Sequence, residues 1–556
     1  MVLKRQLRNI IVVILALLFV AGCGPIETQI APVLTDEVDR LPTPTPFQPI
    51  QNELYLATSL PQAWRNSLAG LASGQISTVD TGSVLSLSLD KPLENEKEYG
   101  VFTRVYAAVV PFPTVVDDIS NDALIALLRG TPSGGGVFTQ LIMSEESAPI
   151  FSALWGGNPS GQLLVLNQDE ILDEAWQSTS TVAIIPFEEI NPKWKVLRVD
   201  GMSPLDKPLD TGKYPLFLQY HLNGPIDLIS QHFDLAARIV AEIPTTNRDE
   251  EKMTVVVMSG TTALTRTIAY KMDLKGTDYP TQDIKEWFLS ADLRHVSNEV
   301  SITPKCPDPD PWTPSLIFCT EEKYLPVLDS IGVNVVELTG NHLNDYGREA
   351  FADTLEIYRK RGWDYFGGGL NLAEAQQPLE ITANGNKIAF IGCNIAGPKS
   401  DFATETSAGS APCIPGEFYT TISRLKNEGF TVIATFQHHE VYVYMYDAAL
   451  RKEFLEAAAA GADIVQGSQA HFPMGFEFSG DSFIHYGLGN FLFDQMDTPV
   501  NGTRREFIDR HIIYDGNYIN TELLTALLTD WSRPVPMTPE DRQQFLEDIF
   551  QASEMR

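Results

Sequence analysis

Runs of apolar and β-branched residues predict several buried strands along the chain. Such runs occupy residues 181–187, 254–258 and 333–338, and a shorter one occupies residues 53–57. This composition is typical of buried strands, because branched side chains pack well on a pleated surface. The runs lie in both halves of the chain, so we expect sheets in both.

Helix caps predict two helices before residue 245. Ser59 is placed to cap a helix that runs through Ala69. A second helix opens at residues 119–122, runs to Leu128, and is stopped by Gly130. The mixture of strands and helices predicts an α/β body in this part of the chain.

A change in composition at residues 245–251 separates two predicted bodies. At 556 residues the chain is too long for one ordinary core. We predict an α/β domain over residues 53–248, an α+β domain over residues 252–515, and a C-terminal helical extension over residues 516–556.

Residues 1–22 have the pattern of a lipoprotein signal peptide. Lys4, Arg5 and Arg8 precede an apolar run at residues 10–20, which is shorter than the roughly 20 residues of a membrane-spanning helix. The run ends in Val20-Ala21-Gly22-Cys23, which resembles a lipobox. We therefore predict an extracytoplasmic protein anchored to the cell membrane by lipid on the Cys23 thiol. A buried cysteine in an apolar stretch is the alternative.

Residues 23–52 predict an extended tether behind the lipid. They are rich in Pro and Thr, above all at residues 41–46, and they show no periodic apolar face. Segments of this composition stay extended and solvated. The tether would hold the folded part of the chain away from the membrane.

The acidic excess excludes one class of partner. Asp and Glu number 72 against 40 Lys and Arg, which gives a formal net charge of −32. Phosphate contacts need clustered basic side chains, and the sequence has no basic stripe, so we expect no nucleic-acid partner. An acidic surface also repels anionic lipid, so membrane attachment is expected to depend on the lipid anchor.

Four cysteines remain besides Cys23, in two pairs that are local in sequence. Export favours disulfides, so we predict the bonds Cys306–Cys319 and Cys393–Cys413. Each bond would close a short loop and stabilise the fold by roughly 3 kcal/mol in the chain-entropy model. A zinc site is the alternative, although no Cys-x-x-Cys spacing occurs.

The segment before residue 245 carries short motifs in a fixed order. They are residues 119–124, Leu128-Arg129-Gly130, and residues 182–187, 196–201 and 213–216. Together they resemble type II periplasmic solute-binding proteins of the phosphate-binding kind. The resemblance implies two lobes with a ligand between them, often at helix N-termini. It places no ligand residue in this chain, so a solute receptor and a scaffold without a small molecule both stay open.

A second and more specific set of motifs follows residue 253. Its blocks are residues 254–260, 291–299, 339–347, 436–442, 461–471 and 486–491. In this order they resemble the CapA family of poly-γ-glutamate capsule proteins. The resemblance implies a calcineurin-like metallophosphatase fold, which is a β-sandwich flanked by helices with ligands on loops at the strand ends.

The resemblance also implies the residues of a site. The implied catalytic residues are Asn341, His342 and Asp345. His342 would act as an acid near the leaving group. The implied metal ligands are Glu299, Asn341, His439 and His471. His485 lies on an apolar strand, where we expect a buried, hydrogen-bonded histidine.

Several family ligand positions carry neutral side chains in this chain. The replacements are Thr261 for Asp, Ser297 for Asn, Gln437 for His and Ser468 for His. Two divalent cations about 4 Å apart need a bridging carboxylate, which Thr261 cannot supply. We therefore predict at most one divalent metal ion, and a site without catalytic metal stays open. A two-metal site also stays open if a shift of one residue brings His438 or His439 into reach.

These features predict a cell-envelope lipoprotein that helps to make, export or retain an anionic surface polymer such as poly-γ-glutamate. Its expected partners are the membrane, through the lipid, and the polymer or its synthase complex. Two other functions stay open. One is a metal-dependent hydrolase acting on a polyglutamyl, peptide or phosphoester bond, and the other is a solute receptor that uses residues 53–248.

Overall fold

The computed structural model describes residues 54–71, 76–77, 85–131, 136–156, 161–226, 230–468 and 470–555. Contacts divide the chain into Met1–Gln51 and one compact unit, Asn52–Arg556. The predicted signal peptide, the lipidation site Cys23 and the predicted tether lie outside the described residues. None of the described helices is long and apolar enough to cross a bilayer.

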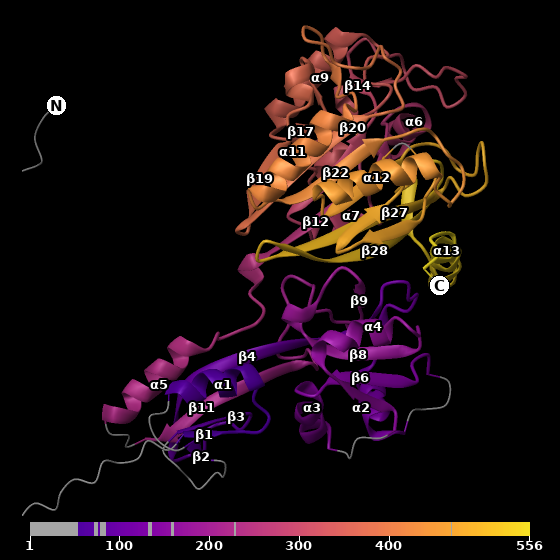
Figure 1. Cartoon of the computed structure of the whole chain (residues 1–556). Coiled ribbons are helices and arrows are strands. Elements are labelled where there is room, and N and C mark those ends of the chain that lie inside the picture. The colour runs from indigo at the N-terminus through magenta and orange to yellow at the C-terminus, as the bar shows by residue number, and fades with distance from the viewer. Residues whose placement is uncertain are drawn as a thin grey trace, which may run out of the picture. The chain divides into compact units, whose positions relative to one another are not determined.

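A nine-stranded sheet organises the first part of the described chain (Figure 1). Its order is β2-β1-β3-β11-β4-β8-β6-β7, and β9 pairs with β4. Strand β4 (Glu96–Pro111) pairs with β11 over its first part and with β8 and β9 over its last residues. This long strand therefore joins the two halves of the sheet. The other strands are β1 (Leu54–Leu56), β2 (Ile76–Ser77), β3 (Leu85–Ser88), β6 (Gln140–Ser144), β7 (Leu163–Leu166), β8 (Thr181–Pro186), β9 (Trp194–Val196) and β11 (Phe217–Pro225).

The helices around this sheet include both that the sequence predicts, but the first begins at Gln62, so Ser59 lies three residues before it and does not cap it. They are α1 (Gln62–Leu71), α2 (Asn121–Arg129), α3 (Ser147–Trp155), α4 (Ile171–Ala175) and α5 (Ser230–Glu242). At the start of α2 the Ser120 hydroxyl accepts a hydrogen bond from the Ala123 N–H at 3.2 Å. Gly130 ends the helix with φ 71°, a left-handed conformation that glycine adopts without strain. The prediction for this helix is confirmed, caps included.

Two sheets pack face to face in the second part of the described chain. The eight-stranded sheet has the order β17-β16-β13-β12-β27-β28-β29, with β26 paired to β12. Its strands are β12 (Met253–Thr262), β13 (Leu293–Asn298), β16 (Val335–Glu337), β17 (Asp364–Phe366), β26 (Asn490–Leu492), β27 (Arg505–Tyr514), β28 (Asn517–Thr529) and β29 (Arg533–Pro536). The six-stranded sheet has the order β19-β20-β22-β23-β25-β24. Its strands are β19 (Leu379–Ala383), β20 (Asn386–Asn394), β22 (Thr431–Gln437), β23 (Ile464–Gly467), β24 (Phe476–Ser479) and β25 (Ser482–His485).

Alternate side chains of the apolar strands enter different cores. Val256 and Met258 of β12 pack with Phe390 and Ile433 of the facing sheet. Val255 and Val257, one position away, belong to the core that the helices cover. This strand is wholly buried because it has a sheet on one side and helices on the other. The predicted β-sandwich flanked by helices is confirmed.

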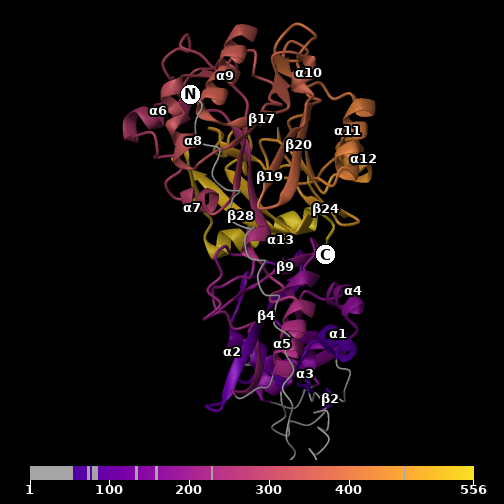
Figure 2. The ribbon, with the colours of Figure 1, turned by 90° about the vertical axis from the view of Figure 1, so that its left-hand side faces the viewer.

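Helices cover the outer faces of both sheets. Figures 1 and 2 show α11 (Pro415–Asn427) and α12 (Ala448–Ala460) side by side over the six-stranded sheet. Their apolar side chains form one core with the outer face of β20, β22 and β23. The remaining helices are α6 (Arg266–Lys275), α7 (Lys285–Leu289), α8 (Pro326–Ser330), α9 (Arg348–Arg361), α10 (Leu372–Ala375) and α13 (Pro539–Ala552).

The prediction of a helical extension over residues 516–556 is wrong for its first part. Strands β28 and β29 complete the eight-stranded sheet, and only α13 is helical. Strand β28 is mostly buried, but its sequence does not alternate regularly between apolar and polar residues. Pairing with β27 along most of its length decided the strand conformation.

Packing continues across the boundary predicted at residues 245–251. Arg542 of α13 donates two hydrogen bonds to the Asp117 carboxylate, at 2.7 and 2.9 Å. The ring of Phe112 contacts those of Phe476 and Phe550 edge-on, with centroids 5.8 and 6.1 Å apart. These contacts agree with the single compact unit Asn52–Arg556.

Candidate functional site

The predicted site residues lie at the carboxyl ends of parallel strands. Strands β12, β13 and β16 run parallel in one sheet, and β20, β22 and β23 run parallel in the other. Glu299 directly follows β13, and Gln437 ends β22. A hydrogen bond joins these two side chains, so the carboxyl ends of β13 and β22 lie close together although the strands belong to different sheets.

Gly340 allows the loop after β16 to approach Glu299. A Cβ at position 340 would lie 2.8 Å from the Glu299 Cα, closer than side chains tolerate. The same loops are tied by a backbone bridge between Val300 and His342. Glycine therefore places Asn341 and His342 against Glu299, which is the arrangement that the sequence motif implies.

The amide of Gln437 lies between two of the predicted metal ligands. Its Nε2 donates to Glu299 Oε1 and to Asn341 Oδ1, both at 3.1 Å. Its Oε1 accepts from the Ser468 hydroxyl at 2.9 Å. Gln437 is wholly buried, so these bonds satisfy an amide that has no access to water. Two side chains that replace family histidines are thus joined to each other.

Glu299 is a buried acid with one unpaired oxygen. Only 1% of the residue is exposed, and Oε2 has no hydrogen-bond partner among the described residues. Burial raises the pKa of Glu299 to about 7, although the nearby His342 opposes the shift. The group can therefore donate or accept a hydrogen bond near neutral pH.

His342 and Asp345 form a pair on the same loop. The His342 Nδ1 lies 2.8 Å from Asp345 Oδ2. Burial opposes the charged imidazole, but the bond to Asp345 and the charge of Glu299 outweigh it and raise the pKa of His342. The ring of Phe318 covers the imidazole, with centroids 4.6 Å apart. His342 is therefore oriented from two sides.

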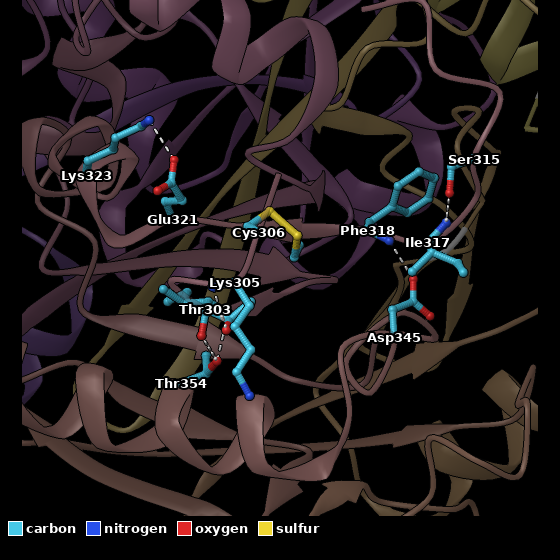
Figure 3. Close-up of a disulfide and its surroundings, with 12 residues drawn as sticks. Thr303, Lys305, Cys306, Ser315, Ile317, Phe318, Glu321, Lys323, Asp345 and Thr354 are labelled. Carbon is cyan, nitrogen blue, oxygen red and sulfur yellow. Dashed lines mark hydrogen bonds and ion pairs between the residues drawn. A yellow bond between two sulfur atoms is a disulfide. The ribbon is translucent and has the colours of Figure 1, made fainter. Parts of the chain in front are cut away.

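A disulfide holds the segment that carries Phe318. Cys306 and Cys319 are bonded, with Cα atoms 5.7 Å apart. Figure 3 shows Asp345 next to this segment, where its carboxylate accepts the Phe318 N–H at 2.7 Å. The second predicted disulfide, Cys393–Cys413, is also present. Both follow the sequence-local pairing that we predicted, and the first one ties its loop to the site.

His471 is a further buried histidine of the predicted site. Only 4% of the residue is exposed, and its Nδ1 lies 2.7 Å from Asn490 Oδ1. Burial lowers the pKa of His471 to about 4, despite the bond to Asn490, so the ring is neutral at physiological pH. Asn490 is the first residue of β26, within the motif block at residues 486–491, and it orients this histidine.

Sequence reasoning missed an ion pair beside the site. Arg266 pairs with Asp494, and its guanidinium lies 4.7 Å from the Phe318 ring centroid and 5.3 Å from that of Phe493. The Phe493 ring also contacts the His471 ring at a tilt, with centroids 4.5 Å apart. Nothing in the sequence pairs Arg266 with Asp494, which lies 228 positions away.

Comparison with known proteins shows what the part of the chain that contains this site is similar to. Residues 255–495 match the family model of the bacterial capsule synthesis protein PGA_cap. The capsule biosynthesis protein CapA of Bacillus anthracis is 27% identical over 265 residues, which cover 46% of this chain and 64% of that protein. Residues 255–495 are therefore similar to the CapA family. The chain spans less than two thirds of this relative's length.

Solved structures similar to the chain fall into two groups. An ABC-type phosphate transport receptor from Vibrio cholerae covers 34% of this chain and 93% of its own, with 14% identity and a TM-score of 0.28. The NAD nucleotidase NadN of Haemophilus influenzae covers 53% of this chain and 56% of its own, with 10% identity and a TM-score of 0.31. Both likenesses are too weak to imply a shared activity.

The CapA-like site does not fit a two-cation centre. Glu299 Oε1 and Asn341 Oδ1 both accept from the Gln437 amide, and the Thr261 hydroxyl donates to the Ser468 carbonyl at 2.7 Å. A bridging carboxylate is therefore missing where two cations would need one. Within the described ranges, no three His, Cys, Asp or Glu side chains are grouped to hold a metal ion.

The predicted metal ligands are not all buried together. Glu299 and His471 are buried, whereas His439 is exposed on a loop after β22. His438 does not rescue the site, because it turns towards α12, where its Nε2 lies 3.2 Å from Glu453. His485 is buried and lies 2.6 Å from Asp509, as we expected of a structural histidine.

A separate cavity of about 500 Å³ lies in the part that resembles solute-binding proteins. Its charged walls are two arginines and four glutamates: Arg65, Arg104, Glu145, Glu146, Glu188 and Glu189. Arg104 is already paired with Glu188 at 2.5 Å. The acidic surplus repels phosphate-like anions, so the ligand class implied by the resemblance does not fit this cavity.

Proposed function

We propose that this chain is a cell-envelope lipoprotein that binds an anionic, amide-linked surface polymer such as poly-γ-glutamate during its synthesis, export or retention. The similarity of residues 255–495 to the CapA family supports a role with capsule polymer. The lipid on Cys23 would keep the protein at the membrane where the polymer emerges. In this proposal the CapA-like site binds the polymer and does not hydrolyse it.

The Gln437 amide is the observation that carries the proposal. An amide N–H donates to two oxygens that a hydrolytic family site would present to cations. Neutral hydrogen bonds of this kind stabilise the fold, whereas they supply no Lewis acid and no activated water. In this proposal the site keeps its loops and the buried acid Glu299, but it lacks the metal ligands that two-metal catalysis needs.

The remaining groups match an amide-linked acidic chain. Glu299 Oε2, which has no partner among the described residues, can accept an amide N–H. The raised pKa of His342 favours an imidazolium that donates to a carboxylate. Asn341 can bond either side of a peptide group. Together they offer hydrogen-bond donors and acceptors to one unit of such a chain.

Metal content gives the first test. We expect purified protein to carry no more than one equivalent of divalent metal by elemental analysis, because the site lacks a bridging carboxylate. Chelation should leave polymer binding unchanged. Two tightly held equivalents, together with polymer cleavage that is lost in His471→Ala, would establish the hydrolase instead.

Polymer binding gives the second test. His342→Ala should weaken the affinity for purified poly-γ-glutamate about tenfold, the scale of one charged hydrogen bond. Binding should also weaken as the pH rises through the raised pKa of His342, because the imidazolium loses its charge. The measurement is calorimetric titration, with His439→Ala as the control because His439 is exposed. Equal losses in both variants, or none in either, would refute the proposal.

A further inference from the structure

A cavity of about 870 Å³ lies where α4, β24, α12 and the C-terminal end of α13 meet. None of its walls belongs to the predicted metal ligands or catalytic residues of the CapA-like site. It also shares no wall residue with the cavity in the part that resembles solute-binding proteins. The function proposed above therefore leaves this cavity without a role.

Three partly exposed aromatic rings line the cavity. They are Trp176, directly after α4, Phe478 of β24, and Tyr446, in the loop before α12. Trp176 contacts Phe478 edge-on, with centroids 6.3 Å apart, and Phe478 contacts Phe112 in the same way at 5.2 Å. Tyr446 stacks on Tyr486, with centroids 3.8 Å apart. Because each ring is held by another ring, a ligand orders few side chains when it binds.

Apolar side chains extend this aromatic wall. Leu172, Met445 and Met555 line the cavity beside the rings, and Met445 is 59% exposed. Methionine is unbranched and polarizable, so it adapts to the shape of an apolar group. Ligand sites of this size commonly combine such walls with a few polar groups. The walls therefore fit a ligand with an apolar part.

Acidic side chains outnumber basic ones around the cavity. The acids are Asp173, Asp447, Glu477 and Glu554, and the bases are Lys193 and Arg451. Arg451 donates to both carboxylate oxygens of Glu477, so this pair is neutral as a whole. Lys193 has its nearest acidic partner, Asp481, outside the wall at 3.9 Å. The remaining acids therefore leave the cavity with a negative charge.

Two of these acids are open to solvent and have no cation beside them. Asp173 and Glu554 are exposed, and neither forms an ion pair within the part of the chain that the structure describes. Asp447 differs, because its Oδ1 accepts the N–H groups of Ala449 and Leu450 at the start of α12. A ligand in the cavity can approach Asp173 and Glu554 directly, and their charge favours a cation.

The aromatic wall selects one kind of cation. A primary ammonium is strongly hydrated and has three N–H groups that need acceptors, which aromatic rings do not supply. A quaternary ammonium donates no hydrogen bond and is attracted to the faces of aromatic rings. Rings and carboxylates in one cavity therefore fit a quaternary ammonium better than a primary one.

We propose that this cavity binds a small molecule that carries a quaternary ammonium group and an apolar substituent. The ammonium matches the three rings and the two exposed carboxylates, and the substituent matches the apolar side chains beside them. The proposal is independent of polymer binding at the CapA-like site, because no residue belongs to both sites.

Calorimetric titration of the full-length protein with benzyltrimethylammonium tests the proposal. This cation should bind, and more weakly at higher salt, because exposed carboxylates supply part of the attraction. Benzylammonium carries the same charge on a primary nitrogen and should bind about tenfold more weakly. Benzyl alcohol is uncharged and should not bind.

Variants of two wall residues locate the site. Trp176→Ala removes one ring and should weaken binding about tenfold, whereas Trp176→Phe keeps a ring and should keep most of the affinity. Asp173→Asn removes one exposed charge and should weaken binding about threefold at low salt. The matched controls are Trp312→Ala, at a tryptophan that is 89% exposed outside the cavity, and Glu94→Gln, at another exposed acid. Both should leave the affinity unchanged.

Three results would overturn the proposal: no binding of benzyltrimethylammonium, equal binding of benzylammonium or benzyl alcohol, or unchanged affinity in both Trp176→Ala and Asp173→Asn. Trp176 packs on Phe478, so thermal melting of its variants is measured alongside. If Trp176→Ala unfolds, Asp173→Asn decides alone, because Asp173 is exposed and its loss leaves the packing intact.

Discussion

Replacing Gln437 by Leu should lower the free energy of unfolding by about 3 kcal/mol. The change leaves Glu299 Oε1, Asn341 Oδ1 and the Ser468 hydroxyl without the bonds that the amide makes. Each lost bond inside a buried site costs about 1 kcal/mol or more. Urea unfolding of the variant and the wild type measures the difference. The exposed Gln377→Leu should change stability little.

The Gln437→Glu variant tests whether the amide of Gln437 or a bound cation stabilises this site. A carboxylate at this position would face the acid Glu299 at close range and would lose the two donated bonds. We therefore expect a loss of stability at neutral pH that acid partly restores, since protonation removes the repulsion. Restoration by a divalent metal, instead of by acid, would show that the site still accepts a cation. A Gln437→Leu variant as stable as the wild type would contradict the role given to the amide.

Cys23→Ser should abolish lipidation and release or mislocalise the protein. Lipid attachment requires the thiol, which a hydroxyl cannot replace, so we expect complete loss of labelled palmitate. Cell fractionation gives the second measurement. Thr43→Ala, in the predicted tether, should keep both the label and the location. Palmitate incorporation that persists in Cys23→Ser would disprove the anchor.

Local patterns predicted much of the fold. Ser120 and Gly130 bracket α2 because capping depends on a few neighbouring residues. Continuous apolar runs gave β8 and β12, since a strand covered on both faces shows no polar alternation. Strand β28 differs from the predicted helical extension because it pairs in a hairpin with β27, the strand directly before it in the chain. The turn between them, Asp515-Gly516, is a local signal for a hairpin.

The site was predicted in part. The motif order placed Glu299, Asn341 and His342 at strand ends, and the structure brings these three together. His439 and His438 could not be placed from sequence, because one exposed loop decides which way each ring turns. The bond from Gln437 to Glu299 joins residues 138 positions apart, so only the packing of the two sheets creates it.

The sequence alone determined the short-range features of this protein: its helix caps, its buried strands, its sequence-local disulfide pairs and the substitutions at family ligand positions. The tertiary structure decided what those substitutions do. In the sequence, Thr261 and Gln437 indicate only that two metal ligands are missing. In the fold, Thr261 donates a hydrogen bond to the Ser468 carbonyl, and Gln437 donates to Glu299 and Asn341. The reason is physical: a cap depends on neighbours in the chain, whereas the partner of a buried polar group depends on which strand ends the packed sheets bring together.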